Sequence, residues 1–209
     1  MLSKDAFVTM VTRVAPVVGT SSRAVNAQVM PWDSWPWTPQ VHLVWFVHRV
    51  EGVAPGIYLQ LRDPSALAGL RAGFREDVLW EPALGLDAFF LLVPLDCRSL
   101  ARRLSCDQDI ASDGYVGMAM LARMEPALRE FGPWFYRHLF WECGMVGQVL
   151  YLEAEAAGGR ATGIGCFYDD AVHNVLGIRD HEWQSLYHFS IGTPVEDARL
   201  TTVPGYSWE

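Results

Sequence analysis

The segment YRHLFWECG occupies residues 136–144, and QVLYLEAEAAGG at 148–159 and TGIGCF at 162–167 follow it in this 209-residue chain. Apolar residues lie on nearly every helical face of the first two segments, which predicts a buried central helix over 134–157. Gly158 and Gly159 end that helix. Gly163, Ile164 and Gly165 are then predicted to form a tight turn, because glycine lets the backbone approach a ligand closely.

Regular elements are also predicted on both sides of this segment. Apolar runs indicate strands at 41–47, 57–61, 88–93 and 185–191. Capping residues and prolines indicate helices after Ser3, at 64–70, at 99–104 and at 169–176, the last capped by Asp169 and Asp170. A hairpin opens the sheet while helices and strands alternate, so a mixed α+β sheet is expected.

Composition predicts a folded, acidic protein. With 51% hydrophobic and 19% charged residues, the chain can form one domain over 1–209, with an irregular part at 1–40 and an extended tail at 194–209. The net charge of −8 argues against nucleic-acid partners. The N-terminus lacks a signal-peptide pattern, and no run is apolar enough to span a membrane, so a cytoplasmic protein is expected.

The four cysteines give no metal or disulfide pattern. They lack C-x-x-C spacing and paired histidines, which argues against a metal site. Cys143 and Cys166 stand in apolar runs and are predicted to be buried thiols. Cys106 is weighed as a nucleophile with a distant histidine, but a turn at a helix end is favoured. His42, inside an apolar strand, is expected to be a hydrogen-bonded core residue.

Several elements resemble the SagB-type, thiazoline/oxazoline-oxidase-like branch of the nitroreductase family. VEGVAPGIY at 50–58 is similar to the branch's hairpin, and the start of the 136–144 segment, the GIG at 163–165 and the LGI at 176–178 follow in the expected order. The resemblance covers about residues 40–193. It implies a three-layer α-β-α sandwich with a mostly antiparallel sheet, and it favours a strand over the ambiguous run 115–121.

The resemblance also implies chemistry. Family members hold FMN between two units, as a homodimer or a pair of homologous domains, and pass hydride through the flavin. Carried over by position, Gly163, Ile164, Gly165 and Cys166 are the implied cofactor-binding residues. Tyr136 is the implied catalytic residue, with a packed core tyrosine as the other interpretation. The branch oxidises azoline rings in modified peptides, so a small-molecule or modified-peptide substrate is expected.

Departures from the family pattern leave a second interpretation open. The Arg-Arg-Ser element that binds the FMN phosphate is missing near the N-terminus, and a Trp-Pro segment at 31–39 replaces a Pro-Ser-Gly-Gly stretch. The chain would then be a flavin-free scaffold half that supports a catalytic homologue. The loop at 21–28 partly matches a ribityl-binding loop of ordinary nitroreductases. Trp32, Trp35 and Trp37 either line a substrate groove or, as favoured, cover an edge of the core.

Overall fold

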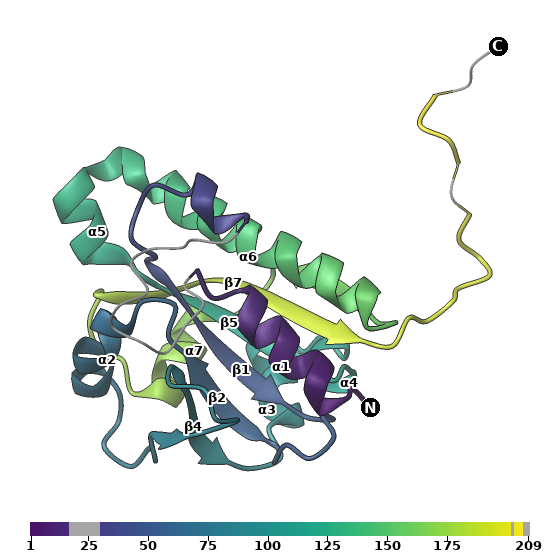
Figure 1. Cartoon of the computed structure of the whole chain (residues 1–209), viewed down its shortest axis with the longest axis horizontal. Coiled ribbons are helices and arrows are strands. Elements are labelled where there is room, and N and C mark those ends of the chain that lie inside the picture. The colour runs from purple at the N-terminus through teal and green to yellow at the C-terminus, as the bar shows by residue number, and fades with distance from the viewer. Residues whose placement is uncertain (17–29, 202, 207–209) are drawn as a thin grey trace.

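The computed structural model describes residues 1–16, 30–201 and 203–206, which form a seven-stranded sheet with helices on both faces (Figure 1). The strand order is β3-β4-β2-β1-β5-β7-β6, and every pairing between these strands is antiparallel. This confirms the predicted α+β class and three-layer sandwich. The strands are β1 (Val41–Val47), β2 (Gly56–Gln60), β3 (Glu81–Pro82), β4 (Phe89–Pro94), β5 (Val116–Arg123), β6 (Arg160–Ile164) and β7 (Trp183–Gly192).

Two hydrophobic cores lie on the two faces of the sheet. One face is covered by α1 (Lys4–Arg13), α5 (Met124–Phe131) and the long α6 (Tyr136–Ala156). The other is covered by α2 (Leu67–Gly73), α3 (Arg98–Leu104), α4 (Ile110–Asp113) and α7 (Asp169–Leu176). Short 3-10 turns lie at Trp32–Ser34, Pro64–Ala66 and Pro133–Phe135.

Strand β1 lies at the middle of the sheet and contributes to both cores. Leu43 and Trp45 pack into the core under α6, whereas Val44 and Phe46 pack into the opposite core. Because side chains alternate between faces, a strand covered on both sides is apolar at nearly every position, as predicted for 41–47, where His42 is the one polar residue. The ambiguous run at 115–121 is likewise a strand, β5.

Helix α6 is buried on one side only. Leu139, Cys143, Val146 and Leu150 are buried against the sheet. Trp141 and Leu152 on the other side are 53% and 61% exposed. The apolar residues found all around the helix therefore fall into two groups. One group packs into the core, and the other is exposed to solvent on the outer side of the helix.

A buried ion pair fastens α6 to the start of β1. The Arg62 guanidinium contacts the Glu142 carboxylate, and both side chains are fully shielded from solvent. Glu142 also accepts hydrogen bonds from the backbone N–H groups of Gln40 (3.0 Å) and Val41 (3.3 Å). Burial raises the pKa of Glu142, an effect that the Arg62 charge opposes. These contacts satisfy groups that would otherwise be buried without partners.

Some elements differ from the sequence-based expectations. Helix α5 and the short strand β3 have no counterpart among the predicted elements. Asp169 and Asp170 lie in the first turn of α7, but the N-cap residue is Tyr168, and no side chain caps the helix. Ser3 does cap α1, accepting a hydrogen bond from the Ala6 N–H. The loop at 21–28 lies outside the described residues. Among the described residues, no helix has the length and apolarity needed to cross a bilayer.

Candidate functional site

The predicted Gly-x-Gly turn is wrong in its first half. Gly163 and Ile164 belong to the edge strand β6 and pair with Phe189 and His188 of β7. Glycine inside a strand often marks a close approach of other atoms, which sequence alone does not distinguish from a turn. Ile164 points into the core beneath α7 and is 3% exposed, so its side chain anchors the strand.

Two tyrosine side chains contact and cover Gly163. The Gly163 N–H donates a hydrogen bond to the Tyr151 hydroxyl oxygen at 2.9 Å. A Cβ placed on Gly163 would overlap the Tyr187 hydroxyl oxygen, so that ring covers the glycine. Burial raises the pKa of Tyr187, as expected for a partly covered phenol. Gly163 is therefore needed to admit a tyrosine of the same chain, and its N–H is already paired.

The backbone becomes accessible one residue after the strand. Among the described residues, no atom lies within 4 Å of the position that a Cβ would take on Gly165. Cys166 is exposed, so the expectation of a buried thiol is wrong, because the chain has left the sheet before this residue. Cys143 is buried as predicted. Of the four residues implied to bind a cofactor, Gly165 has open space beside its backbone and Cys166 has an exposed side chain.

Tyr136 lies far from this backbone within the chain. It begins α6, is 48% exposed, and packs its ring edge-on against Phe140 at 5.1 Å. Tyr151, which contacts Gly163, is 15 positions further along the same helix. At about 1.5 Å per residue, roughly 22 Å of helix separates the two tyrosines. The structure does not bring Tyr136 and Gly163 together in one protomer.

The exposed side of α6 is largely apolar. We define this α6 outer face by residues at helical spacing that are exposed: Tyr136, Arg137, Phe140, Trp141, Gly144, Gln148, Tyr151, Leu152 and Glu155. Arg137 and Glu155 are its charged residues, and Arg137 lies over the Trp141 ring at 5.5 Å. Gly144 lies at its centre, and no atom of the described chain lies within 4 Å of where its Cβ would be. A glycine inside a helix costs about 1 kcal/mol relative to alanine. Packing among the described residues does not explain this glycine.

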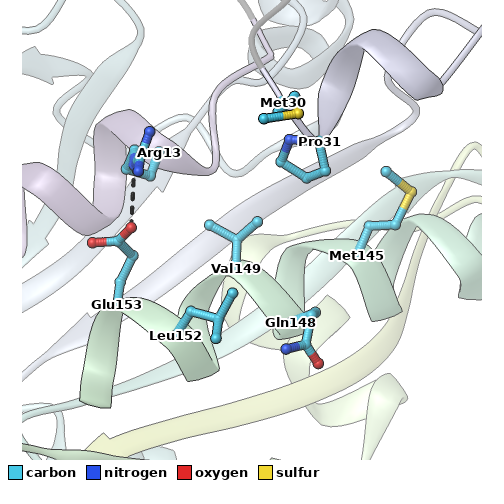
Figure 2. A pocket seen from close by; sticks show the side chains of 8 residues that line it. All are labelled: Arg13, Met30, Pro31, Met145, Gln148, Val149, Leu152 and Glu153. Atoms are coloured by element: carbon cyan, nitrogen blue, oxygen red, sulfur yellow. Dashed lines mark hydrogen bonds and ion pairs between the residues drawn. The ribbon is translucent and has the colours of Figure 1, made fainter. Parts of the chain in front are cut away.

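A small cavity of about 310 Å³ lies between α1 and α6 (Figure 2). Its walls are mainly apolar, and the Arg13–Glu153 ion pair (3.1 Å) closes one end. Ligand pockets start at about this size. Because Arg13 is paired with Glu153, it is not a free anchor for a phosphate. The lining residues are Arg13, Met30, Pro31, Met145, Gln148, Val149, Leu152 and Glu153.

The indoles at 32–37 cover the first turns of α6, as favoured over a groove. Trp32 and Trp35 are buried, and the Trp37 ring packs 4.8 Å from His138. The Trp32 indole N–H donates to the Arg13 carbonyl oxygen at 2.9 Å. Arg62 stacks over the Trp32 ring at 4.5 Å, which joins this cluster to the buried ion pair.

The histidines with the largest pKa shifts are structural. His42 accepts a hydrogen bond on Nδ1 from the Arg62 N–H (3.2 Å), as a core histidine should. Burial, with the Arg62 and Arg123 charges, lowers the pKa of His42 to about 3. Burial likewise lowers the pKa of His188 to about 3. In the part of the chain that the structure describes, no three His, Cys, Asp or Glu side chains are grouped to hold a metal ion.

Comparison with known protein families identifies the family of this chain. The sequence model of the nitroreductase family matches residues 78–193, more than half of the chain. The chain belongs to the nitroreductase family. The match runs from just after α2 through β7 and so includes α6, β6 and Gly165. A search of curated proteins finds no match to this nitroreductase-family sequence.

Solved structures share the nitroreductase-family fold. A protein from Anabaena variabilis described as a nitroreductase matches with a TM-score of 0.66 and 18% identity over 93% of this chain. A chain of the E. coli microcin synthetase McbBCD complex with truncated pro-MccB17 bound matches with a TM-score of 0.63 and 17% identity over 94% of this chain. A Ralstonia eutropha protein described as a nitroreductase has a TM-score of 0.57 and 13% identity over 92% of this chain, covering 73% of its own.

The chain spans 34% of the Anabaena chain and 65% of the McbBCD chain. At these identities the likeness concerns the fold.

Two features of the candidate site were absent from the sequence-based analysis. Tyr151 and Tyr187 are brought to Gly163 by α6 and β7, and the cavity joins residues far apart in sequence. Nothing in the sequence paired either tyrosine with Gly163.

Proposed function

We propose that the chain is an FMN-dependent oxidoreductase domain, extending over residues 1–209, that works as a pair with a second copy or a homologous domain. The observation that carries the proposal is the open space beside the Gly165 backbone, next to the exposed Cys166 and directly after β6, in a chain of the nitroreductase family. When bound, the flavin supplies hydride transfer through its ring.

The residues present fit the ring of FMN better than its phosphate. At Gly165 a flat ring meets no described side chain of the same chain, and backbone N–H groups near a reduced flavin stabilise its negative charge. Gly163 has no such role in the proposal, because its N–H is bonded to Tyr151. Arg13, beside the cavity, is paired with Glu153, so among the described residues lining the cavity no unpaired cation is placed for the phosphate.

A second subunit completes the proposed site through the α6 outer face. An exposed apolar surface of this kind marks an interaction site, and Gly144 at its centre permits close approach of another backbone. Tyr136 lies at one end of this surface, about 22 Å of helix from Tyr151, so it would serve the site of the other subunit. In that role its hydroxyl orients the substrate or moves a proton.

For the substrate, we propose azoline rings in modified peptides. Support comes from the hairpin at 50–58, whose sequence resembles that of the SagB-type branch and in which Tyr58 donates a hydrogen bond to the Ala54 carbonyl oxygen (2.8 Å). The McbBCD complex, with truncated pro-MccB17 bound, is one of the proteins whose fold the chain shares.

Specific observations also favour a flavin-free scaffold half. The Gly163 surface is filled by two tyrosines of the same chain, and the arginine beside the cavity is already paired. In this alternative the α6 outer face binds a catalytic homologue, and the chain acts as a structural scaffold without binding flavin.

One titration separates the two functions. The purified chain is mixed with FMN, and flavin fluorescence and the visible spectrum are followed. Saturable quenching with a Kd in the micromolar range, weakened at least about tenfold by Gly165→Val, supports the oxidoreductase. A colourless protein that leaves FMN fluorescence unchanged, alone and with a homologous partner domain added, overturns it and leaves the scaffold.

A further inference from the structure

Two loops far apart in sequence lie against each other at the end of the sheet. One covers residues 105–108, after α3, and the other covers 165–168, after β6. The Gln108 side-chain amide donates a hydrogen bond to the Cys166 carbonyl oxygen at 3.1 Å. The Tyr168 N–H donates one to the Leu104 carbonyl oxygen at 2.9 Å. These bonds fix the spacing of the two backbones.

Each loop carries one cysteine, and the two side chains are neighbours. Cys106 is half-buried and Cys166 is exposed. The interaction with the Cys166 thiol, with some burial, raises the pKa of Cys106, and the interaction with the Tyr168 hydroxyl opposes that shift. Cys106 and Asp107 both adopt left-handed backbone conformations, with φ of 54° and 56°, which non-glycine residues rarely do.

The other two cysteines have different surroundings. Cys97 lies in the core, where its sulfur is 3.4 Å from the Val47 and Gly56 carbonyl oxygens. Burial raises the pKa of Cys97 to about 12 and also raises the pKa of Cys143. Buried thiols of this kind are inert. They provide an internal reference for the reactivity of the Cys106–Cys166 pair.

We propose that Cys106 and Cys166 form a reversible disulfide by exchange with a low-molecular-weight disulfide of the glutathione class. The exposed Cys166 thiolate attacks one sulfur of the small disulfide and releases one small thiol, leaving a mixed disulfide on Cys166. The Cys106 thiolate then attacks the Cys166 sulfur and releases the second small thiol. Both cysteines are oxidised, the small disulfide is reduced to two thiols, and the two protein protons end on the products.

The bond would lock the 165–168 segment to the loop that follows α3. It closes a loop of about 60 residues, and a cross-link over such a span restricts the unfolded chain strongly. The oxidised protein is expected to unfold at a midpoint several degrees higher than the reduced protein, about 5–10 °C. The exchange needs no flavin, so this proposal is independent of the proposed function.

The test uses the full chain, reduced and then equilibrated at about pH 8 with oxidised glutathione. Free thiols are alkylated and peptides are mapped by mass spectrometry without reduction. The expected result is loss of two of the four thiols, no retained glutathione, and one cross-linked peptide pair containing Cys106 and Cys166. Dithiothreitol restores both thiols.

Three variants sharpen the test. Cys106→Ser is expected to trap glutathione on Cys166, because the resolving thiol is missing. Cys143→Ala, which removes a buried thiol, should leave the cross-link unchanged. Gln108→Ala removes one bond between the loops and should lower the equilibrium constant for the cross-link about fivefold. Stable glutathione adducts on both cysteines of the parent protein, or four free thiols after oxidation, would overturn the proposal.

Discussion

Arg62 and Glu142 form an ion pair in which neither side chain is exposed to solvent. Arg62 also donates hydrogen bonds to the Val14 (2.8 Å) and Val41 (3.1 Å) carbonyl oxygens. Through this one guanidinium, the end of α1, the start of β1 and the first half of α6 share a fixed arrangement. The pair thus holds the end of α1 near α6, and these two helices line the cavity together with Met30 and Pro31.

Glu142→Ala is expected to lower the free energy of unfolding by about 3–5 kcal/mol, because it leaves the Arg62 charge buried without its partner. Urea unfolding measures the change. The double variant Arg62→Leu/Glu142→Leu removes the unpaired charge but leaves the Gln40 and Val41 N–H groups and the Val14 carbonyl oxygen without these partners, so it should recover only part of that loss. Glu155→Ala removes an exposed ion pair with Arg160 and should change stability by less than about 1 kcal/mol. Equal losses of unfolding free energy for Glu142→Ala and Glu155→Ala would contradict the stabilising role given to the buried Arg62–Glu142 pair.

Gly165→Val is expected to weaken FMN binding at least about tenfold while changing the unfolding midpoint little. The new side chain enters open space, so it obstructs a ligand but no described part of the chain. Flavin titration and thermal unfolding measure the two effects. If Gly165→Val binds FMN as tightly as the parent protein, the flavin does not lie on this backbone.

Gly163→Ala is expected to destabilise the fold by about 1–3 kcal/mol, because its Cβ would collide with the Tyr187 hydroxyl group. Tyr187→Leu removes that hydroxyl and should make Gly163→Ala better tolerated. A double-mutant cycle of unfolding free energies gives the coupling. Additive single effects would mean that Tyr187 is not what requires glycine at 163.

Gly144→Leu is expected to make the protein monomeric without destabilising each subunit. Leucine is the better helix former by up to about 1 kcal/mol, and no described atom of the chain obstructs it. In a close-packed pair of subunits it would separate the two backbones. Sedimentation velocity over a concentration series measures association, with Gly144→Ala as the smaller substitution. Unchanged association for Gly144→Leu would exclude the α6 outer face as the contact.

Stability is expected to fall with acid below about pH 6.5 because of His42 and His188. Above that pH both imidazoles are neutral whether the chain is folded or unfolded. Below it the two histidines bind protons in the unfolded chain, whereas in the folded chain they stay neutral down to about pH 3. Each histidine then contributes a slope of about 1.4 kcal/mol per pH unit. Urea unfolding at several pH values between about 6.5 and 5 measures this slope. For His188→Gln the slope of the unfolding free energy against pH should be smaller by about 1.4 kcal/mol per pH unit.

The central elements of this fold were predictable because their surroundings are apolar on both sides. The run at 41–47 is β1 residue for residue, since a doubly covered strand is apolar at nearly every position and the one polar residue, His42, is hydrogen-bonded. The start of α1 followed from Ser3 alone. At β6 the same reasoning failed, because an edge strand containing Gly163 has the local pattern of a turn.

Site residues were harder to predict, because they depend on contacts across the chain. Gly163 was correctly singled out as unusual, but the atoms that require it belong to Tyr187 on a neighbouring strand. Cys166 follows an apolar run and yet is exposed, since β6 ends two residues before it. Cys106 carries no local signal that Cys166 is its neighbour. Such pairings arise only when the sheet assembles.

Beyond β7 the chain leaves the body of the molecule, as Figure 1 shows for the stretch that begins at 193. Val195 and Leu200 are 90% and 76% exposed. A protease added to isolated subunits would trim this stretch within the first minutes, whereas docking onto a neighbour would shield it. The rate of this proteolysis, followed by gel electrophoresis, therefore reports whether the subunits have associated.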